Sequence, residues 1–119
     1  MLESGLETLL DLDGQILVQE HGFWVKIEAR EVERTDQRPH GIKYSLTLHA
    51  ADGERLMGFD NAHGPQTRGK KHSAQKVPYD HSHRFGTRKV IPYEFVSAEQ
   101  LIREFFAEVD RVLREVEAE

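Results

Sequence analysis

The sequence contains no cysteine, and its apolar residues occur only in short runs. Without thiolates it can form neither disulfides nor cysteine-ligated zinc and iron–sulfur sites, and it has no cysteine nucleophile. Any metal would therefore have to bind His, Asp or Glu. Apolar runs reach three residues, as at 16–18, whereas a membrane-spanning helix needs about 20. We expect no membrane contact, and since no signal-peptide core follows the acidic start, we expect a cytoplasmic protein.

Acidic residues outnumber basic ones, but the excess is unevenly distributed. The 119 residues carry a formal net charge of −5, whereas residues 62–90 contain seven Lys or Arg, one acid and four of the seven histidines. That segment therefore carries +6 and the rest of the chain −11, so an acidic scaffold holds one basic, His-rich stretch that could bind a polyanion. The candidate nucleic-acid-binding residues are Arg68, Lys70, Lys71, Lys76, Arg84, Arg88 and Lys89.

Length and hydropathy patterns predict a single α+β domain over residues 1–119. Leucines at helical spacing predict a short helix within 1–12, and Asp52-Gly53 predicts a hairpin turn. Ser97 with Gln100 forms a capping box before a broad apolar stripe, which predicts a C-terminal helix covering an antiparallel meander. Strands are predicted from alternating apolar and polar residues at 15–20, 23–34, 42–50 and 54–60.

Between residues 61 and 91 the periodicity fails, which predicts a long loop at about 62–90. Loops of about 30 residues are unusual in compact domains and are commonly functional or disordered. Ordering on a bound partner would reconcile these two readings. Trp24 lies alone on the polar face of its strand, where we expect the N-terminal helix to cover it, although it could also stack on a base or contact a partner.

Several short motifs between residues 41 and 111 together resemble a known family. They are a Tyr-x-Leu strand, a hairpin ending in Phe-Asp-Asn, an Asp-His-x-His-Arg run, a Tyr-Glu-Phe segment and a helix, found at 44–46, 59–61, 80–84, 93–95 and 101–111. The combination resembles the TumE family, small toxins of bacterial and archaeal toxin–antitoxin pairs. The resemblance implies a type II toxin whose cognate antitoxin is a helix-turn-helix protein. In the family the Asp-Asn and Asp-His-x-His motifs lie close together in the sequence, whereas Asn61 and Asp80 are 19 positions apart here.

The Asp-His-x-His run supplies candidate catalytic residues. On an extended backbone His81 and His83 project from one face. Metal-independent RNA cleavage needs a base for the 2′-hydroxyl, an acid for the leaving 5′-oxygen and a cation for the developing charge. Two imidazoles with an ordinary pKa of about 6.5 can be base and acid, with Arg84 or a lysine as the cation. Asp80 or Asp60 could orient an imidazole and fix its tautomer.

Other interpretations of the same residues remain open. Asn61 is a candidate site residue beside Asp60, but the pair could simply form an Asx-turn at a strand end. His40 is predicted to be a loop residue and His49 an exposed residue of the sheet. A basic, His-rich loop can also be merely solvated.

Two further functions compete with the metal-independent ribonuclease, for which we expect no cofactor. A His-x-His pair with a carboxylate is an ordinary divalent-metal set, so His81, His83 and Asp60, with His63 or His72, could serve a metal-dependent hydrolase or nucleotidyl-transferring enzyme. Alternatively, the protein has no enzymatic activity and its basic loop folds on a partner such as DNA or an acidic antitoxin segment. The sequence favours the ribonuclease.

Overall fold

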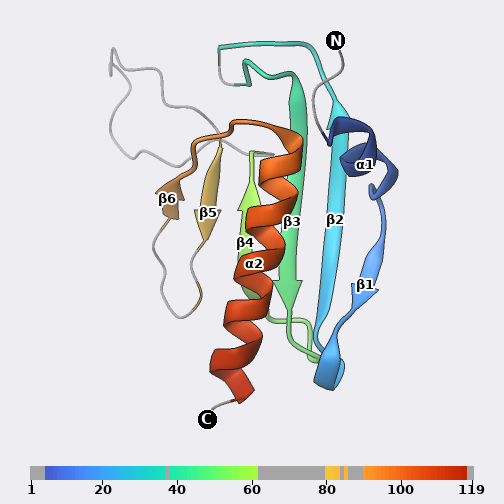
Figure 1. The fold of residues 1–119 in the computed structure, drawn as a ribbon, viewed down its shortest axis with the longest axis vertical. Helices are drawn as coiled ribbons and strands as arrows, with labels where there is room; N and C mark the ends of the chain where they lie inside the picture. The colour runs from blue at the N-terminus through green and yellow to red at the C-terminus, as the bar shows by residue number, and fades with distance from the viewer. Residues whose placement is uncertain (1–4, 37, 62–79, 84, 86–89, 118–119) are drawn as a thin grey trace.

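Six antiparallel strands form one sheet in chain order, with two helices packed against it (Figure 1). The computed structural model describes residues 5–36, 38–61, 80–83, 85 and 90–117. The predicted α+β meander with its C-terminal helix is confirmed. The elements are α1 (Leu6–Asp11), β1 (Ile16–Val18), the 3-10 turn η1 (Glu20–Gly22), β2 (Trp24–Glu31), β3 (Ile42–His49), β4 (Arg55–Asp60), β5 (His81–His83), β6 (Val90–Pro92) and α2 (Ala98–Glu117).

Local sequence explains where these elements turn and begin. At the β3–β4 hairpin, Gly53 adopts a φ of +96° and the Asp52 carboxylate accepts a hydrogen bond from the Glu54 backbone N–H at 2.9 Å. Glycine takes this left-handed conformation without steric cost. Helix α2 begins where the Ser97 hydroxyl accepts the Gln100 backbone N–H at 3.1 Å, as the capping box predicts. Both the turn and the helix start are therefore confirmed.

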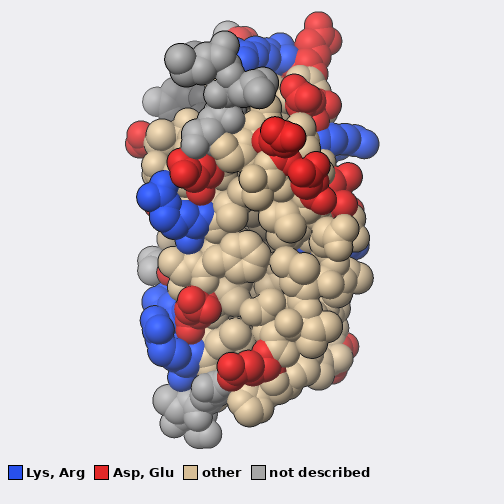
Figure 2. All heavy atoms as spheres, turned by 45° about the vertical axis from the view of Figure 1, so that its right-hand side comes forward, with Lys and Arg blue, Asp and Glu red and all other residues tan. Residues whose placement is uncertain are grey.

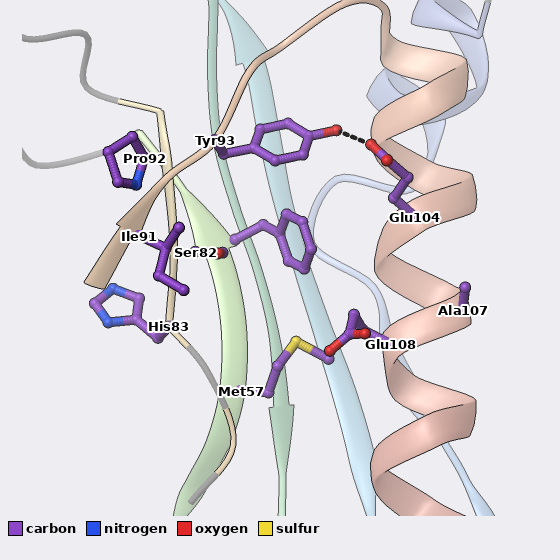
Figure 3. Close-up of a pocket in the computed structure, with 10 residues that line it drawn as sticks. Met57, Ser82, His83, Ile91, Pro92, Tyr93, Glu104, Ala107 and Glu108 are labelled. Carbon is purple, nitrogen blue, oxygen red and sulfur yellow. Dashed lines mark hydrogen bonds between the residues drawn. The ribbon is translucent and has the colours of Figure 1, made fainter. Parts of the chain in front are cut away.

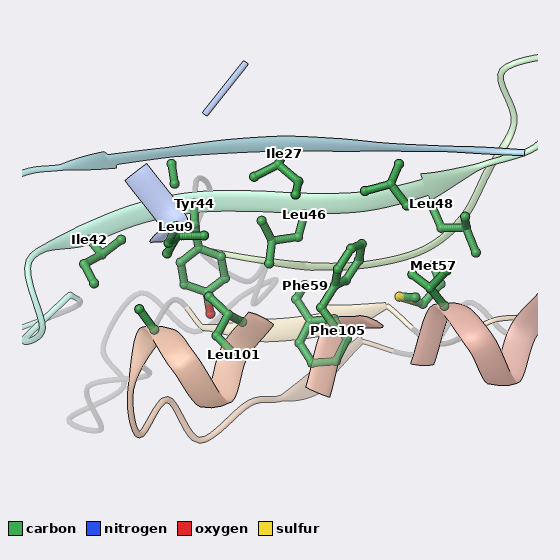
Figure 4. Close-up of a cluster of buried hydrophobic side chains, with 14 of the residues drawn as sticks. Leu9, Ile27, Ile42, Tyr44, Leu46, Leu48, Met57, Phe59, Leu101 and Phe105 are labelled. Carbon is green, nitrogen blue, oxygen red and sulfur yellow. The ribbon is translucent and has the colours of Figure 1, made fainter. Parts of the chain in front are cut away.

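The core lies between the sheet and α2. Alternate residues of β2, β3 and β4 point toward the helix, and Figure 4 shows Leu46, Phe59 and Phe105 meeting there. The Phe59 and Phe105 rings pack edge to face at 6.0 Å. Helix α1 contributes Leu9 to the same core. In the described part of the chain, neither helix is long and apolar enough to cross a membrane.

The sheet thus has an inner face, which packs on the helices, and an outer face, which does not. Trp24 lies on the outer face, where its ring stacks on His49 with centroids 4.1 Å apart and planes 9° apart. The expectation that the N-terminal helix covers Trp24 is therefore wrong, because α1 packs on the inner side through Leu9. Because side chains alternate along β2, Trp24 points to the face of the sheet away from that helix.

The expected loop at 62–90 is interrupted by regular structure. Strand β5 pairs with β4, and β6 pairs with β5 at the edge of the sheet. The prediction of an unstructured segment is therefore wrong for 81–83 and for Val90, where β6 begins. A three-residue strand of sequence His-Ser-His has no apolar alternation, so pairing with β4, not local pattern, specifies it. Residues 62–79, 84 and 86–89 lie outside the described residues.

Charged side chains are not evenly spread over the folded chain. Figure 2 shows the acidic side chains of one face gathered mainly in its upper part, the end at which α1 lies in Figure 1. A broad band without Asp, Glu, Lys or Arg crosses the middle of that face. This distribution fits the acidic scaffold that the sequence implies outside residues 62–90.

Candidate functional site

Pairing of β4 with β5 brings together two motifs that are far apart in the chain. Asp60 lies directly opposite His81, and Gly58 lies opposite His83. Residues opposite each other on antiparallel strands share a face of the sheet. The separation of 19 positions between Asn61 and Asp80 therefore does not keep the motifs apart. All three side chains project from the outer face.

We call Asp60, His81 and His83 the outer-face triad. His81 Nε2 lies 3.4 Å from Asp60 Oδ1, and His83 Nε2 lies 3.5 Å from Asp60 Oδ2. One donor atom from each residue fits within a mutual distance of 4.8 Å. The two imidazole rings meet edge to face at 4.9 Å. His81 is 7% exposed, Asp60 11% and His83 23%, so solvent reaches the triad mainly beside His83.

The Asp60 carboxylate is incompletely satisfied. Its Oδ1 atom is buried and has no hydrogen-bond partner among the residues that the structure describes. Leaving a buried acceptor without a donor costs about 1–3 kcal/mol, and more when the group is charged. Asp60 is therefore held in a position that folding alone does not favour.

The electrostatics of the triad involve a residue that sequence analysis missed. Burial lowers the pKa of His83 below its ordinary value, and the positive charges of Arg55 and His81 lower it further. The Asp60 carboxylate opposes these effects. Arg55 begins β4, the strand that ends at Asp60, and its charge acts on His83 in the folded chain, which no local sequence pattern indicates.

Asp80 belongs to a second cluster, which we call the inner network and which comprises His40, Tyr44, Asn61 and Asp80. Asp80 Oδ2 accepts hydrogen bonds from the Tyr44 hydroxyl at 2.8 Å and from Asn61 Nδ2 at 3.4 Å. His40 Nε2 lies 2.9 Å from the same oxygen. The Ile42 backbone N–H donates to His40 Nδ1 at 3.2 Å, which leaves the proton on Nε2 to be donated to Asp80. Asp80 thus orients His40, not either imidazole of the triad.

The inner network also joins the strands at one end of the sheet. Asn61 Oδ1 accepts the Tyr44 backbone N–H at 2.8 Å, while Asn61 Nδ2 donates to the Ile42 carbonyl at 2.7 Å. Burial, together with the nearby Asp80 carboxylate, raises the pKa of Tyr44 far above its ordinary value. The hydroxyl therefore stays protonated and acts as a donor. Sequence analysis missed His40, because an isolated histidine after a proline gives no signal of a partner 40 positions away.

The structure thus divides the predicted site residues into two groups. Asp60, His81 and His83 converge on the outer face, whereas Asp80 and Asn61 belong to the inner network. The remaining candidates lie outside the described residues; they are Arg68, Lys70, Lys71, Lys76, Arg84, Arg88 and Lys89, with the possible ligands His63 and His72.

A pocket of about 480 Å³ lies on the other side of the same strands, between β5–β6 and α2 (Figure 3). Glu104 and Glu108 line its helical wall, and the Tyr93 hydroxyl donates to Glu104 at 2.6 Å across it. Of the triad, His83 alone lines this pocket. Because its helical wall is acidic, the pocket suits a phosphate group poorly, so the outer face is the better candidate surface for a polyanion.

Comparison with known proteins agrees with the motifs. No curated protein and no solved structure gives a significant match. The family model described as toxin TumE matches residues 10–113, a span that includes the whole sheet, the triad and the inner network. The chain therefore belongs to the TumE toxin family, as its motifs predict.

Proposed function

We propose that this toxin cleaves RNA and that the outer-face triad performs the chemistry. Membership of the TumE family implies a toxin–antitoxin system and a cognate antitoxin, but it does not specify a reaction. The observation that carries the proposal is the convergence of His81 and His83 on the buried Asp60 carboxylate. Two imidazoles and a carboxylate are groups that can move protons or hold a metal during phosphodiester cleavage.

The charge distribution supports a polyanionic substrate. The basic stretch at 62–90 surrounds β5 in the sequence, so the chain on both sides of the two triad histidines is rich in Lys and Arg. Arg55 adds a positive charge that acts on His83 itself. Binding through several phosphate contacts would weaken steeply as salt concentration rises. The acidic remainder of the chain would repel RNA elsewhere.

The metal-independent mechanism predicted from the sequence assigns proton transfers to the two histidines. One imidazole takes the proton of the ribose 2′-hydroxyl as that oxygen attacks phosphorus. The other gives a proton to the leaving 5′-oxygen as the P–O bond breaks, which leaves a cyclic phosphate and a 5′-hydroxyl. Asp60 would fix the tautomer of either ring, since it lies within 3.5 Å of both Nε2 atoms.

Growth arrest tests the proposal directly. Wild type, His81→Ala/His83→Ala and the matched control His49→Ala are expressed from an inducible promoter, with circular dichroism of each purified protein. We expect the wild type and the control to arrest growth, the folded double variant to be harmless, and RNA sequencing to find new ends only in arrested cells. The proposal would be overturned if the protein arrested growth but cleaved no RNA, whether ribosomes were present in the assay or not.

The same experiment separates the enzyme from a toxin that acts by binding alone. A protein whose basic stretch folds on a partner needs the positive charges but not the imidazoles. Full toxicity of the folded double variant would therefore favour the binding protein. We further propose that the antitoxin is a helix-turn-helix protein, which the family resemblance implies. Co-expression with the neighbouring gene product, followed by rescue of growth, tests that partner.

A further inference from the structure

We propose that the outer-face triad binds one divalent transition-metal ion, of the class of Zn²⁺ or Mn²⁺, through Asp60, His81 and His83. The role of that ion in catalysis rests on the proposed function, but its binding does not. The inference concerns the same three side chains, and it replaces proton transfer by the histidines with metal ligation.

The spacing of the donor atoms fits a metal. Zinc lies about 2.0–2.2 Å from nitrogen and oxygen ligands, which places two ligands of a tetrahedral ion about 3.4 Å apart. His81 Nε2 and His83 Nε2 lie 3.4 and 3.5 Å from the two oxygens of Asp60. The three donor atoms already lie within 4.8 Å of one another. A small rotation of His83, the most exposed of the three side chains, would complete the approach.

An independent observation points to a missing ligand. Asp60 is buried, yet its Oδ1 atom has no hydrogen-bond partner in the described part of the chain. Buried charges in proteins are normally paired, hydrogen-bonded or bound to metal. The two neighbouring imidazoles do not satisfy this oxygen by hydrogen bonding, although their Nε2 atoms face the carboxylate. A cation bound between the three side chains would satisfy this oxygen.

The same distances disfavour an acid and a base on either side of a phosphate. In-line displacement places the attacking and leaving oxygens on opposite sides of phosphorus. Two hydrogen bonds of at least about 2.6 Å each, made from opposite sides, total about 5.2 Å before the phosphate is counted. One ring nitrogen of His81 and one of His83 lie within 4.8 Å of each other. An ion therefore fits between these two nitrogens, whereas a phosphate between them would require the rings to move apart.

The ligand types select the class of ion. Imidazole nitrogen suits zinc, iron, nickel and copper, whereas Mg²⁺ and Ca²⁺ prefer oxygen ligands throughout. Two histidines and one carboxylate leave coordination positions open for water or substrate, as catalytic metal sites require. When bound, such an ion would polarise a phosphoryl oxygen and lower the pKa of a bound water. Arg55 is then available as the charged group beside the site.

Metal titration of the whole protein tests the inference without reference to activity. The full chain is produced without a His tag, stripped with EDTA and titrated by calorimetry with Zn²⁺, Mn²⁺ and Mg²⁺. Asp60→Asn and His83→Gln remove one ligand each with little change of volume, and His49→Ala is the control. His81 is left intact because its ring is buried and its loss could unfold the protein. Thermal melting confirms the fold of each variant.

We expect one Zn²⁺ or Mn²⁺ per chain in wild type and control, with much weaker binding of Mg²⁺. Each ligand variant should lose at least about 100-fold in affinity, since even the outer partners of metal ligands contribute about 10–100-fold. The metal should also raise the melting temperature of the wild type and of the control, but not that of the two ligand variants. No stoichiometric binding by the wild type, or equal affinity in the folded ligand variants, would overturn the inference.

RNA cleavage by the same samples separates this inference from the proposed function. Cleavage by stripped protein in EDTA would overturn the catalytic role of the ion and leave the ribonuclease standing, while the titration alone decides whether the site exists. Metal bound at the triad without any RNA cleavage would uphold the site and overturn the ribonuclease. Cleavage restored only by added Zn²⁺ or Mn²⁺, and lost in Asp60→Asn, would support both.

Discussion

The outer-face triad and the inner network each place a buried carboxylate against imidazole, on opposite faces of the same sheet. Both residues are buried: over the whole residue Asp80 is 3% and Asp60 8% exposed, so burial does not distinguish them. Their partners do. Asp80 receives hydrogen bonds from a hydroxyl and an amide and contacts His40, whereas Asp60 keeps a buried oxygen without a hydrogen-bond partner among the described residues. Among the described residues, the inner network gives its carboxylate several donors, whereas the outer-face triad leaves Asp60 Oδ1 without one.

This difference separates a structural use of acid and histidine from a functional one. A fully satisfied network rigidifies the fold, because each member loses a partner if another moves. A partly satisfied one is stable only if the surrounding sheet holds it, and natural proteins keep such strain mainly at functional sites. The two clusters should therefore respond in opposite ways to the same kind of substitution.

Asp60→Asn should give the largest effect, and it should be on activity. Removing the carboxylate while keeping its shape should reduce RNA cleavage by up to about 10⁴-fold, as loss of a carboxylate that orients a catalytic imidazole does, and a lost metal ligand should also abolish most of the activity. The free energy of unfolding should change by less than about 1 kcal/mol, because the lost charge was poorly satisfied. Single-turnover cleavage assays and urea denaturation measure the two quantities. If Asp60→Asn lowered the free energy of unfolding as much as is expected for Asp80→Ala, the two clusters would not differ in function as proposed.

Asp80→Ala should have the next largest effect, and it should be on stability. The substitution leaves the Tyr44 hydroxyl and the Asn61 amide without their buried acceptor, and it also removes the contact with His40. Breaking such a buried polar network costs about 3–5 kcal/mol. Urea denaturation should show the loss as a lower midpoint with an unchanged slope. If the variant keeps its stability but loses toxicity, Asp80 belongs to the active site after all.

Tyr44→Phe sharpens the comparison by removing one donor to Asp80 and nothing else. A hydrogen bond to a charged group contributes about 1.5–3 kcal/mol, so the unfolding free energy should fall by about that amount. The aromatic ring remains in the core, which keeps the packing with α2. Combined with Asp80→Ala, the second substitution should add little, because both remove the same interaction. Full additivity in the double-mutant cycle would mean that the two groups act independently.

The sequence could predict the sheet, the helices and the identity of the triad better than the division between clusters. Alternation and capping are local, so the strand of Tyr44 and the start of α2 could be predicted from nearby residues. The pairing of β4 with β5 is not local, since it closes a gap from Asn61 to Asp80. Alternation along an extended backbone puts Asp80 and His81 on opposite faces, but no pattern in the sequence indicates that Asp80 meets His40 or that His81 meets Asp60.

The smallest effect should come from His49→Ala, which removes an imidazole from the same outer face but from outside the triad. His49 stacks on Trp24, and its Nε2 lies 2.8 Å from the Thr47 hydroxyl. Losing this stack and a partly exposed hydrogen bond should lower the unfolding free energy by about 1 kcal/mol. RNA cleavage and growth arrest should be unchanged, because His49 touches no member of the triad in any described contact. Loss of toxicity in this folded variant would mean that the active surface extends along the outer face as far as Trp24. Convergence on the Asp60 carboxylate would then not be what defines the site.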